Sequence, residues 1–246
     1  MITTIRRETC GNGINCSALH RRENGRMIVS GPTVTDPDTL RELGLPDHES
    51  AVEVTSQLLS GAGLTLLGID DLAEFVDQHH TRDLFRLETL DYYDVTSDGD
   101  DYRRYLRGEP APTAAAKQPW LDRLQADVAA GRRWRRIHAL TTPLTDYLSY
   151  ECEWAYTDNV AAGEDVRIID DASDALLTIG DFFVLDHQHV IRSHYDKAGL
   201  FVGAEVVNEA SAKAPYIAFA DVIWDTAQPF TGWWHQHPEH HRNPAA

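Results

Sequence analysis

The sequence predicts a mixed α/β (α+β) fold, in which helices flank a central mixed sheet. Short apolar runs with the alternation of β-strands, such as DLFRLETL (83–90) and DVRIID (165–170), are separated by segments with helical periodicity. The chain has 246 residues, of which 42% are hydrophobic. It can therefore bury the core of one large domain together with a small additional module.

Residues 1–60 predict a small β-rich module. CSALHRRENGRMIVSG (16–31) reads as two short strands around an Asn-Gly turn, because both turn residues tolerate a positive φ. TDPDTLRELGL (35–45) predicts a short helix with Asp36 as its N-cap and a glycine at its end. AVEVTSQLL (51–59) predicts a strand or the start of a helix.

Residues 61–80 are expected to form a linker and a helix, and residues 81–246 the main α/β domain. In the main domain the predicted strands cover residues 83–95, 133–140 and 165–170, with a hairpin over 181–196. The predicted helices cover residues 100–108, 120–133, 143–156 and 217–230. In helix 120–133 the spacing predicts a buried stripe of Leu121, Leu124 and Val128.

Glu151 falls where the helix predicted over 143–156 should carry an apolar side chain. With Thr142 as N-cap, this helix places Glu151 on one stripe with Leu144, Leu148 and Ala155. A buried and unpaired carboxylate costs several kcal/mol, so Glu151 must be paired, protonated or close to solvent. The candidate partners are the arginines of GRRWRR and Arg167: Arg132, Arg133, Arg135, Arg136 and Arg167.

Two interpretations of this pattern remain open. One is an internal ion-pair network with a purely structural role. The other is a polar ligand-binding pocket, since small-ligand sites place a few polar groups in apolar walls. The candidate ligand-binding residues are Arg86, Glu88, Arg135, Tyr147, Glu151 and Arg167.

The candidate metal ligands lie near the two ends of the chain. Cys10, Cys16 and His20 could supply three zinc ligands, although their spacing matches no standard zinc knuckle. The tail WWHQHPEHH contains His235 and His237, followed by two further histidines, and imidazoles at this density can bind zinc or nickel. Neither pattern is specific, so we assign no metal and no cofactor from the sequence.

The charge of the chain limits its partners. The formal net charge of −17 repels phosphate backbones and anionic lipid, and fits a basic partner. GRRWRR alternates along a predicted strand, so its arginines divide between two faces, and we do not expect direct nucleic-acid binding. No stretch approaches the roughly 20 apolar residues of a membrane span. The N-terminal stretch lacks an apolar signal core and the chain has three cysteines, so we expect a cytoplasmic protein with reduced thiols.

Five stretches of the chain resemble a family of domains of unknown function from high-GC Gram-positive bacteria. They are FRLETLDYYDV, LRGEP, GRRWRRIHALTTPLTDYLSYECEWAYTDNVAAGEDVRII, DFFVLDHQHVIRSHYD and VIWDTAQPFTGWWHQHPEHHR, within about residues 70–241. The resemblance implies a gene often encoded beside a helix-turn-helix regulator. It implies no activity.

The order of strands and helices also resembles one half of a phospholipase-D-like fold. The chemistry of that superfamily uses an HxK pattern, and the closest stretch here is His194-Tyr195-Asp196-Lys197, in which the lysine stands one position too late. This resemblance implies a fold without its catalytic motif.

We therefore expect a non-enzymatic regulatory or partner-binding protein that modulates a helix-turn-helix transcription regulator. The alternative is a small-molecule-binding protein or enzyme that uses a polar pocket around Arg86, Tyr147 and Glu151.

Overall fold

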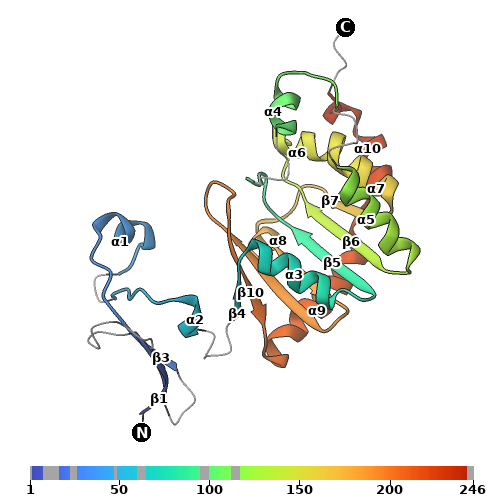
Figure 1. Ribbon diagram of the computed structural model, residues 1–246. Coiled ribbons are helices and arrows are strands. Elements are labelled where there is room, and N and C mark those ends of the chain that lie inside the picture. The colour runs from blue at the N-terminus through green and yellow to red at the C-terminus, as the bar shows by residue number, and fades with distance from the viewer. Residues whose placement is uncertain are drawn as a thin grey trace. The chain divides into compact units, whose positions relative to one another are not determined.

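The computed structural model describes residues 2–7, 17–22, 27–46, 49–59, 65–94, 100–111 and 117–242. The chain divides into two compact units, Met1–Leu66 and Leu67–Ala246 (Figure 1). The division falls inside the segment 61–80 that was predicted as a linker and a helix, and the helix belongs to the second unit.

The first unit contains a three-stranded antiparallel sheet of β1 (Ile2–Arg7), β2 (Ala18–Arg22) and β3 (Met27–Ser30). The pairing of β2 with β3 was predicted, whereas β1 was not. The Asn-Gly turn lies outside the described residues. Ala18 and Leu19 of β2 are fully buried together with Leu58, and they form the small core of this unit.

Two short helices complete the first unit. The predicted helix α1 (Pro37–Leu43) begins where the Asp36 carboxylate accepts a hydrogen bond from the Thr39 backbone amide, at 2.8 Å. It ends at Gly44, whose φ of 59° is left-handed and suits a residue without a Cβ. The segment predicted as a strand or a helix start contains the helix α2 (Ser56–Leu59).

The second unit is built on an eight-stranded mixed sheet, which confirms the predicted fold class. Its strand order is β11-β7-β6-β5-β8-β9-β10-β4. The strands β5 (Asp83–Glu88), β6 (Arg133–Ala139) and β7 (Asp165–Ile169) are parallel to one another. The strands β8 (Phe182–Leu185), β9 (His189–Tyr195) and β10 (Phe201–Val207) continue the sheet in antiparallel order. At the two edges lie β11 (Gln228–Pro229) and β4 (Thr65–Leu67).

The predicted hairpin over 181–196 is the β8–β9 pair, with its turn at residues 186–188. Asp186 and His187 have φ values of 52° and 57°, which fits a tight turn between twisted strands. The strands β10 and β11 were not predicted, and neither was β4, which lies in the segment 61–80 that was expected to form a linker and a helix.

Helices cover both faces of this sheet (Figure 1). On one face, α3 (Ile69–His79) and α5 (Gln118–Ala129) bury Leu72, Val76, Leu121 and Leu124 against strand residues that include Leu84. On the other face, α9 (Ala210–Thr226) buries Ala220 and Ile223 against strand residues that include Phe85 and Leu87. Alternate residues of β5 therefore enter different cores, as the pleat of a strand requires.

One further helix, α7 (Thr157–Ala162), packs beside α5, and its Ala162 lies in the same core as Leu121 and Leu124 (Figure 1). The other helical segments are α4 (Asp101–Leu106), α6 (Asp146–Tyr150), the π-helix η4 (Glu151–Tyr156), α8 (Asp174–Leu177), α10 (Phe230–Gln236) and the 3₁₀ turn η5 (Pro238–His240).

The helix predicted over 143–156 differs from the observed one in its start and in its hydrogen bonding. It begins at Asp146, because the Thr145 hydroxyl, and not Thr142, accepts the capping bond from the Leu148 amide at 3.1 Å. From Glu151 onward the chain forms the wider π-helical turns of η4. Leu144, Leu148 and Ala155 of the predicted stripe still pack in one core, but Cys152, Trp154 and Tyr156 are also buried, which the 3.6-residue periodicity does not predict.

The buried stripe of α5 also differs at one position. Leu121 and Leu124 are buried as predicted, but Val128 is 40% exposed and Asp127 takes the inner position. Asp127 is tolerated there because its carboxylate accepts a hydrogen bond from the Trp134 indole at 3.0 Å and pairs with Arg132 at 2.9 Å.

Truncation of Leu124 and of Val128 to alanine should have different effects on stability, because only the first of these side chains is buried. Leu124→Ala should lower the free energy of unfolding by about 2–5 kcal/mol, because it leaves a cavity in the core. Val128→Ala should cost less than about 1 kcal/mol, because much of that side chain is already in water. Urea denaturation of both variants measures the difference, and equal losses would contradict the observed stripe.

Candidate functional site

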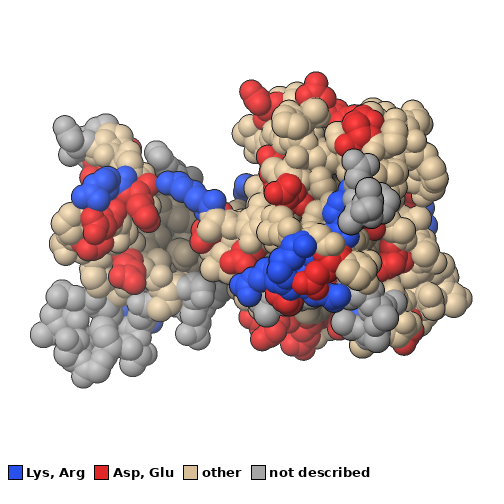
Figure 2. Space-filling view, turned by 90° about the horizontal axis from the view of Figure 1, so that it is seen from above, with Lys and Arg blue, Asp and Glu red and all other residues tan. Residues whose placement is uncertain are grey.

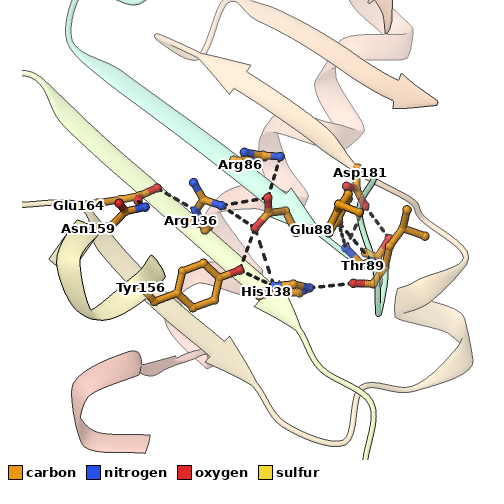
Figure 3. Close-up of polar contacts among 11 residues, drawn as sticks. Arg86, Glu88, Thr89, Arg136, His138, Tyr156, Asn159, Glu164 and Asp181 are labelled. Atoms are coloured by element: carbon orange, nitrogen blue, oxygen red, sulfur yellow. Dashed lines mark hydrogen bonds and ion pairs between the residues drawn. The ribbon is translucent and has the colours of Figure 1, made fainter. Parts of the chain in front are cut away.

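Four charged side chains, three of them buried and one partly exposed, form one group on the face of the sheet that α5 covers. We call Arg86, Glu88, Arg136 and Glu164 the buried charge network (Figure 3). The parallel register of β5 and β6 places Arg86 opposite Arg136. Two like charges in this arrangement repel each other, so the pair depends on an anion between them.

Glu88 supplies that anion. Its carboxylate lies 2.7 Å from the Arg86 guanidinium, and its two oxygens accept hydrogen bonds from the Arg136 Nη1 at 2.9 and 3.0 Å. The Nε of Arg136 donates to Glu164 at 2.8 Å, and Glu164 also accepts a bond from the Asn159 amide at 2.8 Å. The two cations and the two anions thus pair with one another, and the group has no net charge (Figure 3).

A histidine and a tyrosine flank Glu88. The Nε2 of His138 lies 3.0 Å from the Leu90 carbonyl oxygen, which can only accept, so this nitrogen carries the proton. The Nδ1 then accepts from the Tyr156 hydroxyl at 2.5 Å. That hydroxyl is also 3.2 Å from Glu88 Oε2. The hydroxyl has a single proton, so His138 and Glu88 compete for it, and the contact to His138 is the shorter one.

A second carboxylate, Asp181, anchors the chain segment that follows β5. One of its oxygens accepts from the Thr89 backbone amide at 2.8 Å and from the Thr89 hydroxyl at 2.7 Å. The other accepts from the Tyr93 hydroxyl at 2.6 Å. These bonds fix the end of β5 against the residue that precedes β8.

Burial and pairing act on the protonation of the network in opposite directions. Burial raises the pKa of Glu88, but the charges of Arg136 and Arg86 outweigh it and hold this pKa at about 2. Burial also lowers the pKa of His138, which keeps the imidazole neutral at pH 7 in spite of the nearby Glu88. Burial raises the pKa of Asp181 and that of Tyr156. The network is thus ionised, and its two flanking rings are neutral.

Access to this chemistry is restricted. Glu88, His138 and Tyr156 are 3%, 1% and 1% exposed, so a substrate in solvent does not reach the acid–base groups. Arg86 is the member of the network that solvent reaches most, with 26% of its side chain exposed, and its guanidinium lies over the Phe183 ring. The arrangement is suited to holding the strands together, and Arg86 is its one charged group that solvent partly reaches.

The six ligand-binding residues proposed from the sequence lie in different places. Arg86 and Glu88 are bonded to each other. Arg135 and Arg167 lie on the opposite face of the sheet, where both guanidinium groups stack over the Trp224 ring at 4.9 and 4.1 Å. Tyr147 is in an aromatic cluster formed by α4, α6, η4 and the segment that follows β5: Tyr93, Tyr105, Tyr147, Tyr150 and Trp154.

Glu151 is the half-buried first residue of η4. Its charge adds to the effect of burial in raising the pKa of Cys152 and of Tyr156. Of its proposed partners, Arg135 bonds Asp83 at 2.5 and 2.9 Å. Arg167 donates to the Trp224 carbonyl oxygen at 3.0 Å.

The sequence interpretation missed Arg136 as the central cation, together with His138, Tyr156 and Glu164. The available signal was the alternation of β6, which places Arg136 and His138 on one face together. The sequence does not reveal the register of β6 against β5, and this register is what places Arg136 and His138 next to Glu88.

The sequence-proposed metal ligands also have definite environments where they are described. Both nitrogens of His20 lie 3.0 Å from hydroxyl groups, those of Thr4 and Ser30. Cys10 and Cys16 lie outside the described residues. In the tail, His235 Nδ1 is 2.6 Å from the Thr231 carbonyl oxygen, while His237 lies beside Glu239.

The fold and this site define the second unit as a mixed α+β domain whose central strands are held together by buried ion pairs. Residues 70–235 match the family described as "Domain of unknown function (DUF6879)". The chain belongs to this family.

The other comparisons add no function. No curated protein matches the chain in sequence. Among solved structures, one match is that of TrmBL2, described as an archaeal chromatin protein with a novel mode of DNA binding, at 13% identity and a TM-score of 0.36. The match covers 78% of this chain and 61% of that chain, which is less than two thirds of its length. A TM-score this low indicates neither a shared fold nor a shared function.

Within the described residues, no helix is both long and apolar enough to cross a membrane.

Removal of the Glu88 charge should strongly destabilise the second unit. Glu88→Gln leaves Arg86 and Arg136 opposite each other without their shared anion, and we expect a loss of roughly 3–5 kcal/mol in the free energy of unfolding at pH 7. Asp100→Asn breaks the exposed Asp100–Arg107 pair and should cost less than about 1 kcal/mol. Urea denaturation compares the two variants, and a loss below about 1 kcal/mol for Glu88→Gln would show that the network does not hold the strands.

The contribution of Glu88 should depend on pH. Its pKa in the folded protein, about 2, lies below the ordinary value of 4.5, so its stabilisation is fully present above pH 4.5. It is lost as the pH falls from 4.5 toward 2, and a lowering of this size corresponds to roughly 3 kcal/mol. The difference in unfolding free energy between the wild type and Glu88→Gln should therefore shrink over this window. A constant difference would contradict the assignment.

Proposed function

We propose that this chain is a non-enzymatic partner-binding protein that acts on a basic protein, with a helix-turn-helix transcription regulator as the first candidate. The main observation in favour of a non-enzymatic role is that the charged groups of the buried charge network are all paired with one another. The groups that could perform acid–base chemistry, Glu88, His138 and Tyr156, are bonded to one another and shielded from solvent. A general acid or base must instead come within hydrogen-bond reach of a substrate.

The distribution of charge supports a basic partner over nucleic acid. All four arginines of GRRWRR pair with carboxylates of the same chain: Arg132 with Asp127, Arg133 and Arg135 with Asp83, and Arg136 with Glu88 and Glu164. In the view of Figure 2 the basic side chains of the larger unit are interleaved with acidic ones. Such pairing removes the uncompensated basic patch that phosphate binding requires.

The outer side of α3 is a suitable surface for such a partner. Asp70, Asp71, Glu74 and Asp77 are all exposed on this helix. Asp77 is already paired with Arg123, and Asp71 accepts a hydrogen bond from the Gly68 amide at 3.3 Å. Asp70 and Glu74, four residues apart, therefore contribute most of the like-charge repulsion, which destabilises a helix slightly. A basic surface placed against it would relieve the repulsion and would be attracted from a distance.

A second candidate is the binding of a small anionic molecule at Arg86, favoured by the partial exposure of that side chain. This keeps the small-molecule alternative with Arg86 as its contact, without the pocket that was expected to include Tyr147 and Glu151. Glu88 already neutralises Arg86, so an anion at this position must compete with a bonded carboxylate.

Binding of a purified helix-turn-helix regulator encoded beside the gene tests the first proposal. Asp70→Asn/Glu74→Gln removes two charges at an i, i+4 spacing on α3 and should weaken binding about tenfold, which corresponds to about 1.4 kcal/mol. Asp221→Asn/Asp225→Asn removes two charges at the same spacing on α9 and should leave the affinity within about twofold. Isothermal titration calorimetry measures both at two salt concentrations.

Two outcomes would contradict the proposal. One is equal weakening by both double variants, since an unspecific charge effect would explain it. The other is an affinity of the chain for DNA that persists at moderate salt, because the acidic surface should prevent it.

A further inference from the structure

The turn that follows α10 brings together three potential metal ligands that the proposed function does not use. His237, Glu239 and His240 each offer a ligand atom, and these three atoms lie within 4.8 Å of one another. The 3₁₀ turn η5 is responsible, because its three-residue period places His237 and His240 on the same side. Their rings are nearly parallel, with centroids 5.6 Å apart and planes inclined by 17°.

The structure also separates these histidines from the two others in the tail. His235 Nδ1 lies 2.6 Å from the Thr231 carbonyl oxygen, and His241 Nε2 lies 2.9 Å from the Trp234 carbonyl oxygen. In both cases a ring nitrogen is held by the backbone of α10, and neither residue belongs to the cluster. Only two of the four histidines in the tail therefore lie where they could bind the same metal ion.

The geometry around His237 matches that of a metal-binding imidazole. Its Nδ1 forms a hydrogen bond of 2.9 Å with Glu239 Oε1, and the two atoms must move apart by only about 0.4 Å to reach the roughly 3.3 Å between two ligands of a tetrahedral zinc ion. Its Nε2, on the other side of the ring, is 3.7 Å from Asp170 Oδ2. This is an ion-pair distance and is longer than a hydrogen bond, but it places a carboxylate on the side of the ring where histidine ligands of metals commonly have one.

Asp170 is held in place independently of the tail histidines. The buried Trp233 donates its indole N–H to Asp170 Oδ2 at 3.1 Å, and Trp233 packs in the core beside β7. The carboxylate that would orient His237 is therefore fixed by the folded domain, and only the turn η5 has to adjust to an ion.

We propose that His237, Glu239 and His240 bind a zinc ion, with Asp170 as a positioning residue that orients His237. Two imidazoles and one carboxylate form a ligand set that zinc accepts, and the fourth position is left for water or a partner. Calcium and magnesium prefer oxygen ligands throughout and fit this set poorly.

The site has a structural consequence at the end of the described chain. Arg242 follows the cluster by two residues, and its guanidinium lies 4.9 Å from the centre of the Tyr105 ring and 5.4 Å from that of the Trp154 ring. Its Nη1 also donates to the Tyr105 carbonyl oxygen at 3.0 Å. An ion bound at η5 would fix the conformation of this turn, and the turn positions Arg242 against the two aromatic rings. Zinc should therefore raise the thermal stability of the domain.

Zinc titration of the full chain against a competing chelator tests the site. The experiment uses a Cys10→Ser/Cys16→Ser background, because those cysteines are also possible zinc ligands. We expect one zinc ion per chain, and at least about tenfold weaker binding in His237→Gln and in His240→Gln. His235→Gln is the matched control in the same tail and should retain the affinity. Circular dichroism verifies that each variant is folded.

Two further measurements define the ligand set. Cobalt(II) bound at the site should show visible d–d bands, without the near-ultraviolet band of a thiolate ligand, in the wild type and in the Cys10→Ser/Cys16→Ser background. Asp170→Asn should weaken zinc binding while the stoichiometry stays at one. Equal affinities of His235→Gln and His240→Gln would overturn the proposal, and so would binding that depends only on the two cysteines.

Discussion

The second unit depends on the neutralisation of two arginines that the parallel register of β5 and β6 forces together. Arg86 and Arg136 are opposite each other on neighbouring strands in the interior. Glu88 lies between them, and Glu164 balances the remaining charge. A buried ion pair is weak evidence for added stability, but the loss of one partner is costly. The network therefore acts mainly as a constraint on register, because a shift of β6 by one residue would turn Arg136 to the other face of the sheet.

The sequence predicted those parts of the fold that local chemistry decides. The Asp36 cap and the Gly44 end define α1, and the alternation of residues 181–196 defines the β8–β9 hairpin. Helix 143–156 was located only approximately, because periodicity does not reveal that the hydrogen bonds widen to a π-helix from Glu151 onward. The strand β10 was missed, although it completes the antiparallel half of the sheet.

The candidate site was predictable only in part, because its decisive contacts are between distant segments. Arginines and carboxylates alternating in apolar strands indicated internal ion pairs, and Arg86 with Glu88 is one of them. The partner of Arg135 is Asp83, which the sequence interpretation did not consider. In the tail, the sequence showed many histidines without distinguishing them. The hydrogen bonds of His235 and His241 to backbone carbonyls make that distinction.

The spacing of the buried charge network along the chain has a kinetic consequence. Glu88 and Arg136 are 48 residues apart, and Arg136 and Glu164 are 28 residues apart. A folding intermediate that had collapsed around only two of these segments would contain an uncompensated charge in apolar surroundings, which raises its free energy. Such intermediates should be sparsely populated, so the three segments assemble in one cooperative step. Long-range contacts of this kind also slow folding, because distant segments must meet before any of them is stabilised.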